Sequence, residues 1–136
     1  MAKRVFLGGT CNESIWRDLL IPMLKIDYFN PVVDDWTPEC QAEEIRQREQ
    51  CDFCLYTITP RMTGVYSIAE VVDDSNKRPE KTIFCILETD PTGGEQFTKE
   101  QIKSIEAVGK MVERNGGKLF RSLKDVADYL NGEVAV

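Results

Sequence analysis

Thr82-Ile83-Phe84-Cys85-Ile86-Leu87 is a run of apolar side chains with no alternation between polar and apolar positions. Such a run predicts a strand buried on both faces, which is typical of a parallel sheet covered by helices on each side. A helical pattern follows, capped by Thr98, and its apolar side chains recur every three or four residues: Ile102, Ile105, Val108 and Val112. A buried strand followed by an amphipathic helix favours an α/β fold.

The same alternation extends in both directions along the chain. We expect five strands, at residues 5–7, 28–29, 54–58, 82–87 and 118–120. We expect five helices between and after them, over residues 15–24 (weakened by Pro22), 38–50, 67–75, 99–115 and 123–130. The connections are too long for hairpins, so they predict one parallel sheet with helices on both faces. The length of 136 residues predicts a single domain over residues 1–136.

The amino-acid composition argues against several classes of function. The chain has 17 Lys and Arg against 23 Asp and Glu, a net charge of −6. An acidic chain without a basic cluster is a poor partner for duplex nucleic acid or an anionic membrane. No stretch approaches the roughly 20 apolar residues of a membrane span. The chain has no histidine, which excludes Ser-His-Asp triads, Cys-His pairs and His-ligated metal sites.

Five cysteines are present, an odd number with irregular spacing. This pattern favours reduced thiols and a cytoplasmic protein over a secreted disulfide scaffold. Residues 1–4 lead straight into the first apolar run, so we expect no secretory leader. Cys51 and Cys54 form a CxxC at the start of a strand, but no second pair completes a zinc site, so we interpret them as core thiols.

In a parallel sheet, ligands bind at the carboxyl ends of the strands. The segments that follow the strands are residues 8–12, 30–36, 57–70 and 88–94. Gly8-Gly9-Thr10-Cys11-Asn12 is either a ligand cradle with backbone N–H groups facing an anion, or a plain tight turn. Its spacing matches neither the dinucleotide fingerprint nor the Walker loop.

Ser67-Ile68-Ala69-Glu70 also has two interpretations. It has the pattern of a capping box, in which Ser67 and Glu70 stabilise the helix start. Alternatively, Glu70 is a carboxylate aimed into a cleft, kept ionised by the helix dipole and able to attack a sugar carbon.

The nearly all-polar helix 38–50 is either a solvated face or a bridge between subunits, unless one of its acids, Glu43 or Glu44, points into the site. Other candidates are less specific. Asp34-Asp35-Trp36 is either a solvent loop or a place where the acids bind hydroxyls and the Trp36 ring stacks on a base. Arg61 and Tyr66 could orient a polar substrate. Asp73-Asp74 is expected to be a helix end without function.

Four short motifs occur in order: Val5-Phe6-Leu7-Gly8-Gly9-Thr10, Tyr28-Phe29-Asn30-Pro31, Cys51-Asp52, and Gly64-Val65-Tyr66-Ser67-Ile68-Ala69-Glu70. Together they resemble the nucleoside 2-deoxyribosyltransferase family, in its divergent branch, over roughly residues 4 to 90. The resemblance implies a three-layer flavodoxin-like (Rossmann-like) fold, a homo-oligomer of two or more subunits, and a small-molecule nucleoside or nucleotide as partner. It implies no metal and no cofactor.

The resemblance also implies site residues. Glu70 is the nucleophile, and Glu44 corresponds to an acid eight residues before the third strand, where the family usually has Asp. Gly64 stands where the family often has Asp or Ser, and Val5 or Phe6 where several members have Tyr. The substrate-binding residues expected at the strand ends are Gly8, Gly9, Thr10, Asn12, Asn30, Pro31, Asp35, Trp36, Gly64, Tyr66 and Ser67.

The implied chemistry is a retaining double displacement on a (deoxy)nucleoside or nucleoside monophosphate, through a covalent glutamyl-sugar intermediate. Two alternatives stay open at this point. One is a glycohydrolase acting on a dinucleotide such as NAD, and the other is a nucleotide-binding module in which Glu70 is only a helix cap and ribose ligand.

Overall fold

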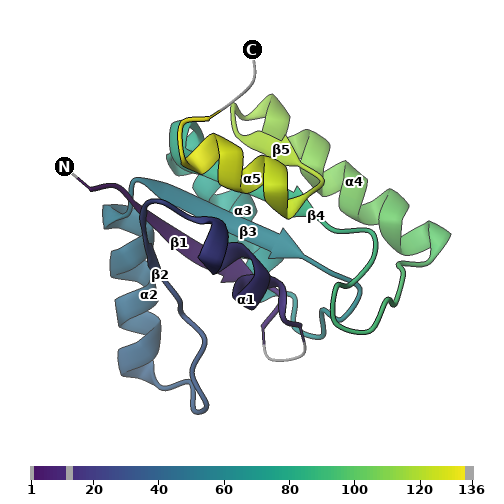
Figure 1. The fold of residues 1–136 in the computed structure, drawn as a ribbon, viewed down its shortest axis with the longest axis horizontal. Coiled ribbons are helices and arrows are strands. Elements are labelled where there is room, and N and C mark those ends of the chain that lie inside the picture. Colours follow the sequence, from purple (N-terminus) through teal and green to yellow (C-terminus); the bar gives the residue numbers. More distant parts are fainter. Residues whose placement is uncertain (1, 12–13, 134–136) are drawn as a thin grey trace.

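A computed structural model describes residues 2–11 and 14–133 (Figure 1). Its five strands form one sheet in the order β2-β1-β3-β4-β5, and every neighbouring pair is parallel. The strands are β1 (Arg4–Gly9), β2 (Asp27–Phe29), β3 (Phe53–Ile58), β4 (Thr82–Ile86) and β5 (Lys118–Phe120). The predicted α/β fold with a five-stranded parallel sheet is confirmed, and its order and layers are those of a flavodoxin-like fold.

Helices cover both faces of the sheet. The α-helices are α1 (Trp16–Leu20), α2 (Pro38–Gln50), α3 (Tyr66–Lys77), α4 (Lys99–Arg114) and α5 (Leu123–Leu130), and the short 3₁₀ helices are η1 (Ile21–Met23) and η2 (Pro79–Lys81). Figure 1 shows α1 and α5 side by side on one face. Buried side chains of α3 and α4 pack on the opposite face, and α2 joins that layer through ion pairs with α3.

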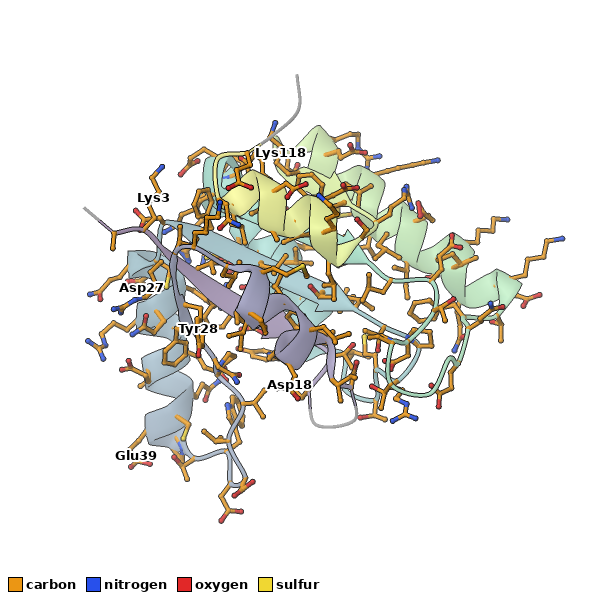
Figure 2. The ribbon with its side chains drawn as sticks, in the orientation of Figure 1. Lys3, Asp18, Asp27, Tyr28, Glu39 and Lys118 are labelled. Atoms are coloured by element: carbon orange, nitrogen blue, oxygen red, sulfur yellow. The ribbon has the colours of Figure 1, made fainter. Side chains whose placement is uncertain are left out.

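Two apolar clusters hold the three layers together. Trp16 and Val126 pack with one face of the sheet, and Val71 and Val112 pack with the other. Every residue of β4 is buried, as the unalternating run predicts. By contrast, the labelled side chains of Figure 2 lie at the periphery and are exposed: Lys3, Asp18, Asp27, Tyr28, Glu39 and Lys118.

The helix boundaries confirm three predicted N-cap residues and correct the predicted extent of the first helix. Thr37, Thr98 and Ser122 cap their helices as expected, each accepting a backbone N–H three residues on. The helix expected over residues 15–24 is instead split, because α1 ends at Leu20 and the chain continues as a 3₁₀ turn containing Pro22. Proline has no N–H to donate and its ring obstructs the preceding turn, so a regular helix ends there.

Gly9 allows β1 to end close against β3. Its φ is +118°, and a Cβ built on it lies 2.0 Å from the carbonyl oxygen of Thr57. We expect Gly9→Ala to lower the free energy of unfolding by about 3 kcal/mol, because backbone strain and the clash with β3 add. Gly94→Ala is the matched control: its φ is +78° but nothing lies within 4 Å of its added Cβ, so it carries the strain alone, about 1 kcal/mol. Equal losses in urea denaturation would contradict the close approach.

Candidate active site

A cavity of about 550 Å³ opens at the carboxyl ends of β1 and β3, beside the start of α3. This volume lies within the range of pockets for small ligands. The predicted residues that it brings together are Gly8, Gly9, Thr10, Pro31, Trp36, Glu44, Arg61, Gly64, Tyr66, Ser67 and Glu70. Residues from four separate segments of the chain therefore meet at one place.

Some predicted residues lie elsewhere. Asn30 and Asp35 are exposed and do not line this cavity; the Asn30 side chain accepts the N–H of Val32 at 3.0 Å and so stabilises a turn. Asn12 lies outside the described residues. Glu43 does not line the cavity, and it accepts hydrogen bonds from Arg46 and Gln47 on its own helix.

Five further lining residues lie within the strand-end segments expected to bind ligands but were not proposed individually: Cys11, Val32, Val33, Met62 and Thr63. The sequence interpretation missed two lining residues outside those segments, Phe6 and Arg17. Phe6 could have been found, because it stands two residues before Gly8 and side chains at this spacing share a face of a strand. No local pattern marks Arg17.

Arg17 shapes the loop after β1. Its guanidinium donates to the carbonyl oxygens of Leu7 at 3.0 Å and Thr10 at 2.6 Å. Only 5% of the residue is exposed, and burial lowers its pKa to about 10, so it remains a cation at neutral pH. Meanwhile the Thr10 N–H donates to Thr57 at 2.9 Å. That N–H is therefore not available to an anion and cannot contribute to a cradle of backbone donors.

Ser67 does not form the expected capping box. The N-cap of α3 is Val65 and no side chain caps the helix. The Ser67 hydroxyl instead donates to the Gly9 carbonyl at 3.2 Å, which ties the start of α3 to the end of β1. Glu70 points elsewhere, toward Arg48 of α2, and both it and Ser67 line the cavity.

Glu70 is an almost buried acid, with 7% of the residue exposed. Burial raises its pKa to about 7, and the neighbouring Arg48 guanidinium opposes that rise. The helix dipole was expected to keep this carboxylate readily ionised, but desolvation outweighs it. Glu70 therefore titrates near neutral pH, the range in which a carboxyl can exchange roles between acid and base.

Glu44 reaches the same cavity from α2. Its carboxylate accepts a hydrogen bond from the indole N–H of Trp36 at 3.2 Å, and burial raises its pKa. The Trp36 ring meets the Tyr66 ring edge to face, with centroids 6.1 Å apart. The cavity thus combines two acids with raised pKa values and an aromatic pair, a set suited to a ring-containing ligand whose bond cleavage needs proton transfer.

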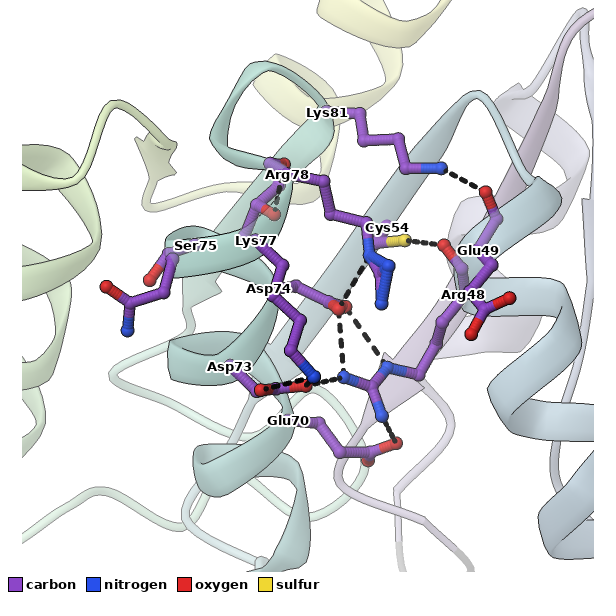
Figure 3. Close-up of polar contacts among 12 residues, drawn as sticks. Arg48, Glu49, Cys54, Glu70, Asp73, Asp74, Ser75, Lys77, Arg78 and Lys81 are labelled. Carbon is purple, nitrogen blue, oxygen red and sulfur yellow. Dashed lines mark hydrogen bonds and ion pairs between the residues drawn. The ribbon is translucent and has the colours of Figure 1, made fainter.

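Asp73 and Asp74 are not a helix end, because α3 continues to Lys77. Asp74 is fully buried and accepts hydrogen bonds from Arg48 at 2.8 Å, from Arg78 at 3.0 Å and from the Tyr56 hydroxyl at 2.5 Å. Figure 3 shows this group of charges directly above Glu70. The expectation that these two aspartates form a helix end is therefore wrong, and both are bonded to Arg48 of α2.

The five cysteines are free. Cys51, Cys54 and Cys85 are buried, and burial raises their thiol pKa values to about 11, 12 and 12, which confirms that the CxxC pair consists of core thiols. In residues 2–11 and 14–133 no group of three His, Cys, Asp or Glu residues is arranged to hold a metal ion. Within the same ranges, every helix is too short or too polar to cross a bilayer.

Comparison with known proteins identifies the family. A search of curated proteins returned no match. The family model described as "Nucleoside 2-deoxyribosyltransferase like" matches residues 2–89, a span that runs from before β1 to just beyond β4 and includes every residue that lines the cavity. The match covers well over half of the chain, and the chain belongs to the nucleoside 2-deoxyribosyltransferase-like family.

Proposed function

We propose that the protein cleaves the N-glycosidic bond of a (deoxy)nucleoside or nucleoside monophosphate through a covalent intermediate on Glu70. The observation that carries the proposal is the convergence of Glu44 and Glu70, from different helices, on one cavity of nucleoside size. Retaining glycosidases use two carboxyl groups in the same way, one as nucleophile and one as acid. The pKa values of both acids are raised, so near neutral pH the pair can hold one proton and one negative charge.

In the first step, a carboxylate oxygen of Glu70 attacks the anomeric carbon of the sugar. The bond from that carbon to the base nitrogen breaks, and its electron pair leaves with the base. Glu44 donates its proton to the departing base, so that a neutral base leaves. The transition state resembles an oxocarbenium ion, which the surrounding carboxylate charge stabilises.

In the second step, ionised Glu44 accepts a proton from water or from an incoming base. The resulting nucleophile attacks the anomeric carbon and breaks the ester bond to Glu70, which regenerates its carboxylate. Water gives hydrolysis, and a base gives transfer. All groups required for both steps come from this chain and from the substrate.

The remaining residues are assigned to binding. We place the base against Trp36 and Tyr66, whose rings are in contact and line the cavity. The remaining predicted binding residues in the lining are assigned to the rest of the substrate: Gly8, Gly9, Thr10, Pro31, Gly64 and Ser67. Asn30 and Asp35 flank this lining without entering it, so any contact they make is with the outer part of a substrate.

The test is a panel of nucleosides, deoxynucleosides, their 5′-monophosphates and NAD, with base release followed by chromatography and the intact protein followed by mass spectrometry. We expect base release and a sugar adduct that is absent from Glu70→Ala. Added free base separates transfer from hydrolysis. Turnover of NAD alone would indicate a dinucleotide glycohydrolase. Binding without base release, unaffected by Glu70→Gln, would indicate a nucleotide-binding module.

We further propose a homo-oligomer. Three apolar or aromatic residues that line the cavity are also exposed, namely Val33, Trp36 and Tyr66, and Val65, the neighbour of Tyr66 in the chain, is 70% exposed. Exposed apolar side chains that gather in one region are typical of an interaction surface. We expect Val65→Asp to reduce the mass measured by sedimentation at micromolar concentration. Aspartate is a favourable N-cap, so α3 should remain folded. Met111→Asp on α4, exposed but outside the cavity lining, is the control; a monomeric wild type would contradict the proposal.

We propose that residues 1–136 act as one catalytic domain, because all five strands belong to a single sheet. We also propose that the enzyme is cytoplasmic. The five free cysteines, three of them buried, support a reducing compartment.

A further inference from the structure

Arg48 is a buried arginine on α2, a helix whose residues are nearly all polar. Only 6% of the residue is exposed, whereas most of its neighbours on α2 are exposed or half-buried. Burying a guanidinium is costly unless every donor finds a partner. The contacts of Arg48 therefore indicate what the residue does.

Most of the guanidinium is anchored by α3. Its Nη2 donates to Asp73 and to Asp74, each at 2.8 Å, and its Nε donates to Asp74 at 3.2 Å. Its Nη1 lies 3.7 Å from a carboxylate oxygen of Glu70. Figure 3 shows the guanidinium bridging the aspartates on one side and Glu70 on the other. The planar fork of arginine can hold both sides at once, which the point charge of a lysine cannot.

We propose that Arg48 is a positioning residue for the reaction: anchored by Asp73 and Asp74, it holds the Glu70 carboxylate ionised and turned toward the cavity. The inference rests on the proposed function, because it gives Glu70 a reaction to serve. At 3.7 Å the contact is longer than a direct hydrogen bond, so it orients the carboxylate and leaves its lone pairs available for attack.

The charges around Glu70 favour this assignment. Burial disfavours its negative charge, and so do Glu44 on α2 and Asp73 and Asp74 on α3. Tyr56 on β3 keeps its proton, because burial raises the pKa of its hydroxyl, and it adds no charge. Arg48 is the cation that opposes burial and these acids. Asp74 in turn is held by Arg78 and by Tyr56, so the position of Arg48 is fixed by groups that do not touch the cavity.

The direct test is the titration of Glu70 by NMR of its side-chain carboxyl carbon, assigned from the signal lost in Glu70→Gln. We expect Arg48→Met to raise the midpoint by about one pH unit or more, because an adjacent opposite charge is removed. Arg48→Lys should fall between the two. Arg46→Met is the matched control: Arg46 lies on the same helix but is exposed and pairs with Glu43, so its variant should titrate like the wild type.

Arg48→Met removes the Arg48 hydrogen bonds to the buried Asp74 carboxylate and leaves it with Arg78 and Tyr56, and this loss could prevent folding. The double variant Arg48→Met, Asp74→Asn removes both charges. Arg48 acts on the charge of Glu70 more strongly than Asp74 does. The titration midpoint of Glu70 should therefore still rise in the double variant, but by less than in Arg48→Met. An unchanged or lowered midpoint in either folded variant would overturn the proposal.

Kinetics give a second readout, using the compound of the panel that is turned over. At pH 7, Arg48→Met should lower kcat more than it raises KM. The ratio of wild-type kcat to variant kcat should then shrink as the pH increases toward 9, since Glu70 becomes ionised in both proteins while the titration of Glu44 affects both alike. A merely structural role would lower activity at every pH and leave the midpoint unmoved. If no compound is turned over but the midpoint moves, the proposed function fails and the coupling stands; an adduct with an unmoved midpoint would reject the Arg48 role alone.

Discussion

Glu70→Gln is expected to lower kcat by on the order of 10³-fold or more and to abolish the covalent sugar adduct, because an amide oxygen cannot replace the carboxylate as nucleophile. The substitution keeps the size of the side chain and leaves an acceptor facing Arg48, so the cavity should still bind substrate. KM should therefore change much less than kcat. Release of base would be measured for wild type and variant with the same substrate, together with the mass of the intact protein. An adduct that persists in Glu70→Gln would place the nucleophile elsewhere.

The stability of the same variant provides a control for folding. The pKa of Glu70 is raised to about 7 in the folded protein, so the folded state binds this proton more tightly than the unfolded state does. That contribution is fully present below pH 4.5 and is lost as the pH rises through about 7. Each pKa unit corresponds to about 1.4 kcal/mol. Glu70→Gln should therefore match the wild type at pH 4 and be more stable at pH 8, by up to about 3 kcal/mol. A variant less stable at both pH values would mean that Glu70 is needed for the fold.

The fold could be predicted from local patterns, because each strand of a parallel sheet and each helix between them has a recognisable sequence pattern of its own. The unalternating run at 82–87 and the capped helices at Thr98 and Ser122 each match the structure. The strand order does not follow from such patterns alone, since pairing depends on contacts between segments far apart in sequence. The end of the first helix was also not predicted, because the chain continues from α1 as a 3₁₀ turn that contains Pro22.

Ser67 and Thr98 show why one local motif can have two outcomes. Each begins a pattern of a hydroxyl residue followed three positions later by Glu or Gln. Thr98 and Gln101 form a full capping box at the exposed start of α4. Ser67 instead bonds to Gly9, and Glu70 faces Arg48. Tertiary partners outcompete the local bonds where the helix start is built into a site.

The burial of Arg17 and Arg48 could not be predicted from sequence patterns. Arg17 and Arg48 are ordinary helix residues in the sequence, and both are at most 6% exposed in the fold. The partners of Arg17 are carbonyl oxygens of β1 and its loop, and those of Arg48 lie on α3, some 25 residues further along the chain. Arg17 meets its partners only because α1 packs on β1, and Arg48 meets its partners only because α2 packs against α3.

Glu44→Gln should lower the rate of base release by about 10²- to 10⁴-fold for nucleosides with a neutral base, since the base then leaves without a proton. Glutamine can still accept the hydrogen bond from Trp36, so the geometry of the mouth should persist. Glu43→Gln is the matched control, because Glu43 precedes it on the same helix but bonds to Arg46 and Gln47. Its activity should stay close to that of the wild type.

A cationic leaving group separates the acid role of Glu44 from a binding role. The base of 7-methyl-2′-deoxyguanosine already carries a positive charge and leaves as a neutral molecule, so its departure needs no proton donor. Glu44→Gln should therefore release the first equivalent of 7-methylguanine about as fast as the wild type. The second step still requires Glu44 as the base that activates water, so the adduct on Glu70 should accumulate and be visible in the intact mass. An equal loss of the first-turnover rate with neutral and cationic bases would mean that Glu44 binds the substrate without protonating it.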